Sequence, residues 1–332
     1  MWCKSAVEKM IVGHYRCLVV LFILLSSGCV NVSVIKPVTP LKQQVVEGKG
    51  HPKILLLNIS GFISEREKSD RLKLQKEPSL VAEVRETLQK AERDADIAGL
   101  IIKINSPGGT VSASDIIHHE LRNFKNKKQV PVYACITGLG TSGAYYIAAA
   151  ADKVYSHPKA ITGSIGVIAL KFNIEGLMAK LGIQDETIKS GDKKDIFSPF
   201  RPLTHEERTI LQEVIDDLHT QFVDVVFEQR KEVLPMEDLM DLADGRIYTA
   251  GSALKLHLID HIGYMDDVIT DIKKSLDLED ARIVSYGRGE EYPGTIYSSS
   301  PTHDSSLMDL LGDYTDGHSP LPGVSFLYLW NP

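Results

Sequence analysis

The chain has 332 residues, of which 43% are hydrophobic and 24% charged, and its formal net charge is −7. This composition is typical of a soluble globular protein that can form a core without disulfides. The acidic balance, with no long run of lysine or arginine, argues against nucleic acid as the main partner. Three of the four cysteines lie in the first 29 residues, so an internal disulfide framework is excluded and Cys135 is expected to be a small core residue.

The N-terminus has the pattern of an export signal. Three Lys or Arg residues precede the nine-residue apolar run 17–25, which is shorter than the about 20 residues of a transmembrane helix. Small residues then precede Cys29, which indicates a lipoprotein signal 1–28 with Cys29 lipidated, although Ser26 stands where such signals usually have leucine. An ordinary cleaved signal and an uncleaved anchor are the alternatives. All three place the body outside the cytoplasm, and we expect a membrane-anchored protein of the bacterial cell envelope.

The first half of the chain alternates between strand and helix patterns. Residues 29–51 are polar, contain prolines and are expected to form a tether. Three continuous apolar runs predict buried strands: 53–59, 98–104 and 130–136. A helix pattern follows each run, at 79–94, from a capping box of Ser112 with Asp115, and after Ser142. This alternation predicts an α/β fold with a parallel β-sheet and crossover helices.

The remainder is predicted to contain short strands and then mostly helices. The short strands are predicted at 153–158, 164–170 and 183–188, with a helix at 174–181. Thr204 and Glu207 form a capping box that opens a long amphipathic helix, and two more helices are expected at 249–260 and 265–276. Residues 287–332 are expected to form a flexible tail with an apolar tip at 323–330. The sequence contains no internal repeat.

Two glycine-containing turns follow predicted strands and could hold reactive groups. In the sequence NSPGG, Gly108 and Gly109 leave backbone N–H groups accessible, and such groups can form an oxyanion hole. A plain strand-to-helix turn is the alternative. Ser142 lies after the next strand at a helix start, where its hydroxyl and the helix N-terminus favour developing negative charge. The alternative there is a helix of small residues chosen for close packing.

A serine nucleophile needs a base, and the sequence offers few candidates. His157 is predicted in an exposed turn, and His118 with His119 on a solvated helix face; no cluster has metal-ligand spacing. The other route is a lysine kept neutral by burial. Residues 188–202 contain clustered lysines, Lys194 among them, beside apolar residues, although such clusters are usually solvated loops.

Three motifs occur in a fixed order: NSPGG, then TSGAYYIAAAADKVYSHPKAITGSIGV, then KSGDKKDIFSPFRP. Together they resemble the signal peptide peptidase A family of serine proteases, from about residue 53 to 285. The resemblance implies the Clp-protease/crotonase fold and makes 52–286 a Ser–Lys peptidase domain.

The resemblance also implies a role for individual residues. Ser142 would be the nucleophile and Lys194 the general base, while Gly109 and Gly143 would form the oxyanion hole. Ser164 in TGSIG would orient the lysine amine. The sequence departs from the family by having threonine before Ser142 and only one glycine after it, which concerns the shape of the pocket rather than the dyad.

No metal, nucleotide or other cofactor is implied by the resemblance. The chain holds one copy of the domain. For such short forms the resemblance implies a ring-like homo-oligomer whose serine and lysine come from neighbouring subunits. The implied substrates are signal peptides left in the membrane and unfolded polypeptides. We also hypothesise that the apolar tip folds back into the substrate groove.

Three rival interpretations stay open. A Clp-type protease with a Ser–His–Asp triad would need a histidine on the strand after the serine helix, and 164–170 contains none. A crotonase-like enzyme acting on acyl thioesters would share the glycine turns without needing Ser142 and Lys194 together. A non-catalytic scaffold of the same fold is the third, and the presence of both dyad residues argues against it.

Overall fold

The computed structural model describes residues 39–69, 76–288, 294–298 and 326–330. The chain divides into two compact units, of which the second comprises Thr39–Lys68 and Glu77–Pro332 and holds the sheet and the candidate site. The first unit, Met1–Val38 with Ser69–Lys76, contains the predicted signal 1–28 and Cys29, and both lie outside the described residues. Across the part of the chain that is described, no helix is long and apolar enough to span a membrane.

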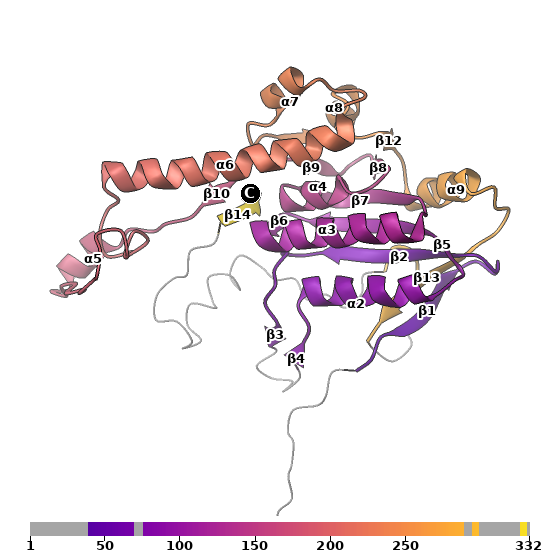
Figure 1. The fold of residues 1–332 in the computed structure, drawn as a ribbon, viewed down its shortest axis with the longest axis horizontal. Coiled ribbons are helices and arrows are strands. Elements are labelled where there is room, and N and C mark those ends of the chain that lie inside the picture. Colours follow the sequence, from indigo (N-terminus) through magenta and orange to yellow (C-terminus); the bar gives the residue numbers. More distant parts are fainter. Residues whose placement is uncertain (1–38, 70–75, 289–293, 299–325, 331–332) are drawn as a thin grey trace, which may run out of the picture. The chain divides into compact units, whose positions relative to one another are not determined.

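The second unit is built on a nine-stranded β-sheet whose main path runs β1-β13-β2-β5-β7-β8-β12 (Figure 1). Its strands are β1 (Lys42–Glu47), β2 (Lys53–Ser60), β5 (Ile97–Ser106), β7 (Val132–Thr141), β8 (Lys153–Ser156), β9 (Ile161–Gly163), β11 (Ile247–Thr249), β12 (His261–Ile262) and β13 (Arg282–Gly287). The pairs β2·β5, β5·β7 and β7·β8 are parallel. The three predicted apolar runs are therefore neighbouring strands, and the prediction of a parallel sheet is confirmed.

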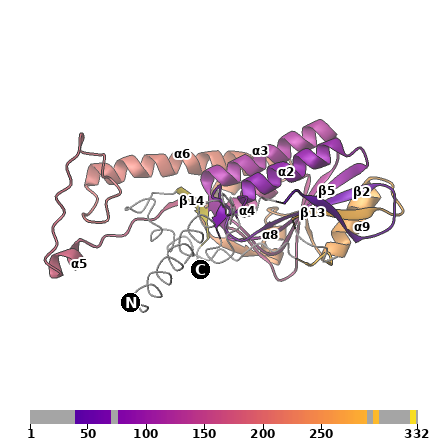
Figure 2. The same ribbon diagram turned by 90° about the horizontal axis from the view of Figure 1, so that it is seen from below.

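Helices cover both faces of this sheet (Figure 2). On one face, α2 (Leu80–Arg93) and α3 (Val111–Lys128) pack over a core that includes Leu100 and Ile102 of β5. On the other face, α9 (Met265–Ser275) packs over a second cluster that includes Ile101. Successive strand residues point to opposite faces, so a strand buried on both sides is largely apolar. In 98–104 the exception is Lys103, whose amine donates to the Ile296 and Ser298 carbonyls.

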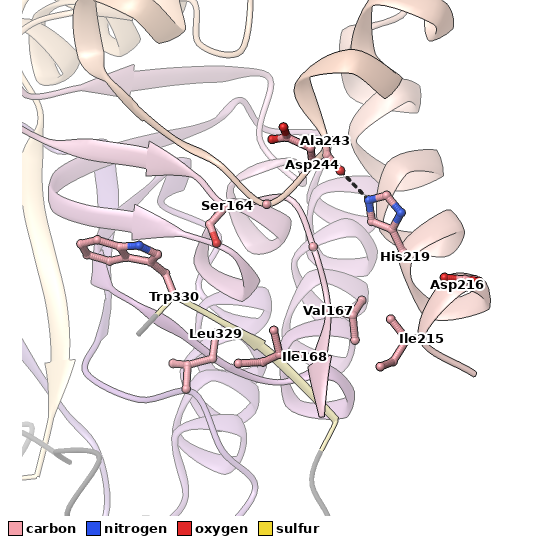
Figure 3. A pocket seen from close by; sticks show the side chains of 12 residues that line it. Ser164, Val167, Ile168, Ile215, Asp216, His219, Ala243, Asp244, Leu329 and Trp330 are labelled. Atoms are coloured by element: carbon pink, nitrogen blue, oxygen red, sulfur yellow. Dashed lines mark hydrogen bonds between the residues drawn. The ribbon is translucent and has the colours of Figure 1, made fainter. Parts of the chain in front are cut away.

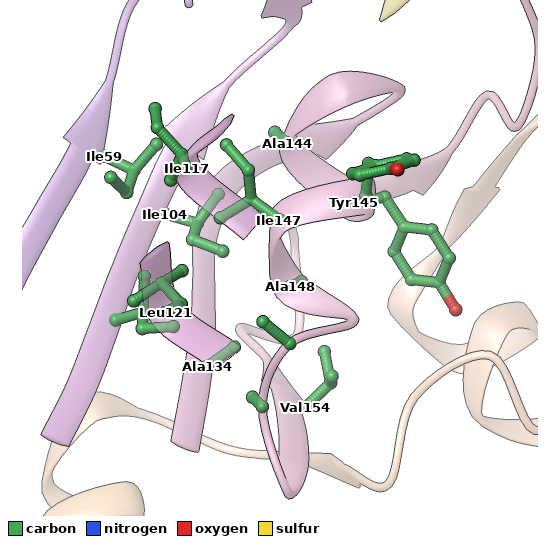
Figure 4. Close-up of a cluster of buried hydrophobic side chains, with 14 of the residues drawn as sticks. Ile59, Ile104, Ile117, Leu121, Ala134, Ala144, Tyr145, Ile147, Ala148 and Val154 are labelled. Atoms are coloured by element: carbon green, nitrogen blue, oxygen red, sulfur yellow. The ribbon is translucent and has the colours of Figure 1, made fainter. Parts of the chain in front are cut away.

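Helix α4 (Gly143–Ala148) follows β7, and all of its residues are buried. Figure 4 shows Ile147 beside Ile104 of the sheet and Ile117 of α3, with Ala144 and Ala148 on the same helix. Small side chains let the helix approach the sheet closely. The alanines after Ser142 therefore do serve packing, while the serine itself stands at the entrance of the helix.

An arm, here residues 170–204, separates the sheet from the long helix α6 (His205–Arg230). It contains α5 (Glu175–Lys180), which has no buried residue and lies away from the sheet in Figures 1 and 2. The predicted capping box of Thr204 with Glu207 is present at the start of α6. Large apolar side chains of the arm are exposed: Leu170, Phe172, Ile174, Leu177, Leu181, Ile183 and Ile188. A single subunit thus leaves the apolar side chains of this segment uncovered.

A second, three-stranded sheet has the order β10-β14-β6. Strand β14 (Phe326–Leu329) pairs antiparallel with both β6 (Gly108–Thr110) and β10 (Ile168–Ala169). The predicted apolar tip therefore contains a strand, whereas most of the tail before it lies outside the described residues. The remaining elements are α7 (Met236–Leu242), α8 (Ala250–Lys255), β3 (Lys68–Ser69) and β4 (Lys76–Glu77).

Four local predictions differ from the structure. Residues 183–188 form no strand and are exposed, since they have no neighbouring strand to pair with. Within 164–170 only β10 is extended. Helix α3 is capped by Thr110, whose Oγ1 accepts from the Ala113 N–H at 3.2 Å, instead of by Ser112. Residues 42–47 of the expected tether form β1, an edge strand beside β13 whose polar sequence gives little strand signal.

Candidate active site

Ser142 connects β7 to α4 in an unusual backbone conformation, with φ 55° and ψ −120°. Its N–H donates to the Gly163 carbonyl at 2.7 Å, and its own carbonyl accepts from the Tyr146 N–H at 3.0 Å. A non-glycine residue held at positive φ costs about 1–3 kcal/mol, and such strain gathers at functional sites. The turn lies at the carboxyl end of a parallel strand, where ligands bind in open α/β sheets.

The hydroxyl of Ser142 is buried and has no hydrogen-bond partner. Leaving a buried polar atom without a hydrogen bond costs free energy. The Ser142 hydroxyl is therefore suited to form a hydrogen bond with a group supplied from outside the subunit. Among the described histidines, none provides that partner: His119 contacts Asn123, and His157 packs edge-on against Tyr264. Ser142 and the histidines of the described residues therefore form no Ser–His pair.

The first glycine turn presents a backbone N–H toward the same place. The Thr110 N–H donates to the Ile63 carbonyl at 2.9 Å, so the preceding N–H, that of Gly109, points to the opposite side of the extended strand. A Cβ built on Gly143 would lie 3.3 Å from the Gly109 nitrogen. The two glycines are thus neighbours, and their N–H groups can form the predicted oxyanion hole.

Ser164 stands next to Ser142 at the end of the adjacent strand. In the parallel register of β7 and β9, Thr141 pairs with Gly163. Ser164 also has a positive φ, 53°, and its N–H donates to the Arg246 carbonyl at 2.7 Å. The register brings together two of the residues singled out in the sequence.

A cavity of about 450 Å³ opens beside Ser164. Figure 3 shows Ser164 and Trp330 on one side of this cavity and His219 with Ile215 on the other. The His219 Nε2–H donates to the Ala243 carbonyl at 2.7 Å, which fixes the ring at the wall. The cavity gives a second group room to approach Ser164 from outside the subunit.

Lys194 lies on the arm and is exposed. The arm extends away from α4 of the same chain in Figures 1 and 2, and the Ser142 Oγ has no hydrogen bond to it. The structure therefore brings Ser142, Gly109, Gly143 and Ser164 together, while the Ser142 Oγ has no hydrogen bond to Lys194 of the same subunit.

The backbone after Lys194 is held by an ionic network centred on Arg201. Its guanidinium donates to Asp195 through Nε at 2.9 Å and Nη2 at 2.7 Å, and to Glu207 through Nη1 at 2.8 Å and Nη2 at 2.6 Å. These bonds lower the pKa of Glu207 to about 2. Arg201, aided by Lys189, also holds the pKa of Asp195 well below its ordinary value. The network joins the lysine loop to the start of α6.

The expectation that His118 lies on a solvated face is wrong. This residue is partly buried, and its ring packs edge-on against Tyr146 with centroids 5.1 Å apart. Burial, with a contribution from Arg122, lowers its pKa to about 4, so the ring is neutral near pH 7. Its burial depends on contact with Tyr146 of α4. The periodicity of the α3 sequence does not predict a contact with a separate helix.

Strand β14 occupies the groove in front of the glycine turn. A Cβ built on Gly108 would lie 2.0 Å from the Tyr328 carbonyl oxygen, so the strand passes directly over β6. This position agrees with the hypothesis that the apolar tip folds back onto the site.

Comparisons with known proteins agree with the family resemblance seen in the sequence motifs. The profile of peptidase family S49 matches residues 124–279, and that of Clp protease matches residues 71–162. A candidate signal peptide peptidase SppA of Enterococcus faecium is 34% identical over 245 residues, covering 74% of this chain and 70% of the relative. A candidate protease of Methanocaldococcus jannaschii is 39% identical over 203 residues, covering 61% of this chain and 64% of the relative.

Among solved structures, a serine-to-alanine mutant of the 1510-N membrane-bound stomatin-specific protease aligns with a TM-score of 0.43 and 14% identity. The alignment covers 67% of this chain and 85% of that one.

The fold and the family comparisons define a serine peptidase with the Clp-protease-like fold. The chain belongs to peptidase family S49, the family of the signal peptide peptidase A proteins that its motifs resemble.

Proposed function

We propose that this protein is a membrane-associated endopeptidase in which Ser142 is the nucleophile and Lys194 of a neighbouring subunit is the general base. One observation carries the proposal: the Ser142 hydroxyl is buried without a partner, while Lys194 is exposed on an arm that extends away from it. A ring-like homo-oligomer would give the Ser142 hydroxyl a partner and bury the exposed lysine, because each arm can reach the site of the next subunit. The substrates are signal peptides left in the membrane and unfolded polypeptides, in line with the name of the Enterococcus relative.

The chemistry follows from the positions of these groups. Ser142 Oγ attacks a peptide carbonyl while the neutral amine of Lys194 takes its proton. The N–H groups of Gly109 and Gly143 stabilise the oxyanion. The protonated lysine then gives its proton to the leaving amine, and water hydrolyses the acyl-enzyme by the same route. Ser164 receives a hydrogen bond from the lysine amine and orients it.

A lysine acts as a base only when its amine is neutral, which requires removal from water. In the single subunit Lys194 is exposed, and apolar residues follow it at Ile196, Phe197 and Phe200. These residues are already partly buried in the single subunit, where Phe197 packs edge-on against Phe326, and docking of the arm on a neighbouring subunit would bury the amine beside them. Assembly and activation of the base are thus one event in this proposal.

Mixing inactive subunits tests the shared site. Ser142→Ala and Lys194→Ala each should abolish hydrolysis of a fluorogenic peptide. When the two variants are unfolded, mixed and reassembled, sites that pair an intact serine with an intact lysine from the next subunit should restore about a quarter of wild-type turnover. A dyad formed within one chain would restore none, and full turnover by either single variant would show that the dyad assignment is wrong.

A wild-type protein inert to peptides and to serine-directed phosphonates would favour the scaffold alternative. Membrane association through Cys29 is tested separately by envelope fractionation of the wild type and Cys29→Ala. The variant should lose lipid labelling and shift out of the membrane fraction, whereas unchanged labelling would contradict the lipoprotein signal.

A further inference from the structure

Ser106 is the serine of the NSPGG motif and has no part in the chemistry proposed above. It is the last residue of β5 and is fully buried. Its hydroxyl donates to the Gly61 carbonyl at 2.6 Å and accepts from the Gly108 N–H at 3.1 Å. The Gly108 carbonyl lies further from this oxygen, at 3.5 Å, so the single hydroxyl proton goes to Gly61. One buried side chain therefore ties the glycine turn to the residue that follows β2.

The chain after Gly61 then runs alongside the turn. The Ile63 N–H donates to the Gly108 carbonyl, and the Thr110 N–H donates to the Ile63 carbonyl, both at 2.9 Å. Ile63 and Gly109 form a parallel bridge, and Ile63 is fully buried. Residues 61–63 are here called the brace, because they hold the turn from the side away from Ser142.

The brace determines where the Gly109 N–H points. In a planar trans peptide the C=O and the following N–H point in opposite directions. Because the Gly108 carbonyl is bonded to Ile63, the Gly109 N–H is directed away from the brace. It faces Gly143, on which a Cβ would lie 3.3 Å from the Gly109 nitrogen.

The glycines alone do not fix this direction. Gly108 has a φ of 104°, a conformation open to glycine among several others of similar energy. Its N–H is held by Ser106 and its carbonyl by Ile63. Without the Ser106 hydroxyl, the buried Gly108 N–H and the Gly61 carbonyl would both lose a partner, which favours a different arrangement of the turn.

We propose that Ser106 is a positioning residue, which aims the Gly109 N–H at the oxyanion by fastening the turn to the brace. The inference rests on the proposed function and adds to it a side chain that does not touch the substrate. An oxyanion donor acts only when it lies about 2.7–3.1 Å from the charged oxygen. A rotation of the Gly108–Gly109 peptide therefore removes the donor even though both glycines are still present.

The kinetic test is Ser106→Ala in the full chain. We expect kcat on a fluorogenic peptide to fall about tenfold to a hundredfold with KM nearly unchanged, since the donor acts on the transition state and not on the bound peptide. A peptide aldehyde, whose carbonyl adds the Ser142 hydroxyl and places its oxygen in the hole, should lose affinity by the same factor as kcat/KM. Unchanged kcat, or unchanged affinity for the aldehyde, would overturn the proposal.

Thr137→Val is the matched control. The Thr137 hydroxyl donates to the Ile104 carbonyl at 3.1 Å, so this variant also loses a bond from a hydroxyl to a carbonyl near the end of β5, without touching the turn. Its melting temperature should fall about as much as that of Ser106→Ala, while kcat and aldehyde affinity stay at the wild-type values. Equal losses of kcat in the two variants would show that Ser106 acts only through general stability and would contradict the proposal.

Crystal structures of the wild type and Ser106→Ala separate this inference from the proposed function. A rotated Gly108–Gly109 peptide, with the bond between Ile63 and Gly108 broken, supports the role of Ser106 even if no peptide is hydrolysed and the peptidase proposal fails. A peptide that keeps its direction, with the Gly109 N–H still facing Gly143, refutes that role even if the chain is an active peptidase.

Discussion

Ser142 and Ser164 stand at adjacent strand ends with nearly the same φ, 55° and 53°. The Ser142 N–H donates to the carbonyl of Gly163, the residue directly before Ser164, at 2.7 Å. Holding two non-glycine residues side by side in this conformation is costly, and the parallel register of β7 and β9 maintains both. A group entering from outside would meet the two serines together.

Removal of the Ser164 hydroxyl tests whether it orients the base. In Ser164→Ala the backbone conformation is retained by the neighbouring hydrogen bonds, so only the contact with the lysine amine is lost. We expect kcat to fall about tenfold to a hundredfold with KM nearly unchanged, as for loss of one positioned hydrogen bond. Steady-state kinetics on one peptide measure this, and an equal rise in KM would instead indicate a role in substrate binding.

Arg201→Gln should release the loop that carries Lys194. The substitution removes the charged bonds to Asp195 and Glu207 and leaves the nearly buried Glu207 carboxylate unpaired. We expect kcat to fall at least about tenfold because a lysine without a fixed position is a poor base. Lys189→Ala, which removes a more peripheral bond to Asp195, is the control and should stay near the wild type.

The same network predicts a loss of order in acid. The pKa of Glu207 is about 2 in the folded chain against an ordinary 4.5, and that of Asp195 is lowered too. A lowered pKa stabilises the fold above the ordinary value, and this contribution is lost as pH falls from about 4.5 toward 2. The protection factors of residues 195–207, which are exchange rates corrected for the intrinsic effect of pH, should therefore fall through this window, and those of Arg201→Gln should be lower already at neutral pH.

Glycine is required at the two candidate oxyanion positions. A Cβ on Gly109 would lie 1.9 Å from the Ile63 carbonyl oxygen, and one on Gly143 would lie 2.3 Å from the Ser114 Oγ. Gly109→Ala and Gly143→Ala should each lower kcat about a hundredfold or more, as for a displaced oxyanion donor. Gly251→Ala, where no atom lies within 4 Å of the new Cβ, should leave both kcat and thermal stability unchanged or slightly improved.

Deletion of residues 318–332 removes β14 from the groove. Because this strand pairs with β6 over the glycine turn, its removal should raise the rate on short peptides several-fold by ending the competition for the groove. Peptidase assays and sedimentation of the intact and shortened chains measure rate and assembly. An unchanged rate together with unchanged assembly would contradict a position of the tail in the groove.

The sheet core and the serine turn could be predicted because their signals are local. Apart from Lys53, Asn58 and Lys103, the runs 53–59, 98–104 and 130–136 are apolar, as is typical of strands buried on both faces, and Ser142 follows the last of them. Strands β1 and β13 were missed, since they lie toward one edge of the sheet and β1 is mostly exposed. Strand 183–188 was predicted from composition alone, although nothing in the fold pairs with it.

In the proposed assembly the serine and the lysine of the dyad come from different chains. The motif around Lys194 predicts its role as a base through resemblance. A sequence does not say whether an exposed arm contacts the serine of its own subunit or that of another. The side chain of Tyr328, on the chain's last strand, contacts both α4 and α6. These contacts join residues more than 100 positions apart in the sequence. The hydrophobic periodicity of a single helix or strand does not predict them.

The exposed arm makes catalytic output depend on subunit concentration. Its large apolar side chains, such as Phe172, Leu181 and Ile188, are covered only by another copy in the proposed ring. Under the proposed assembly an isolated subunit has a nucleophile without a base and cannot attack unfolded chains around it. Specific activity should fall steeply on dilution as rings dissociate, so the enzyme becomes active only where it has accumulated.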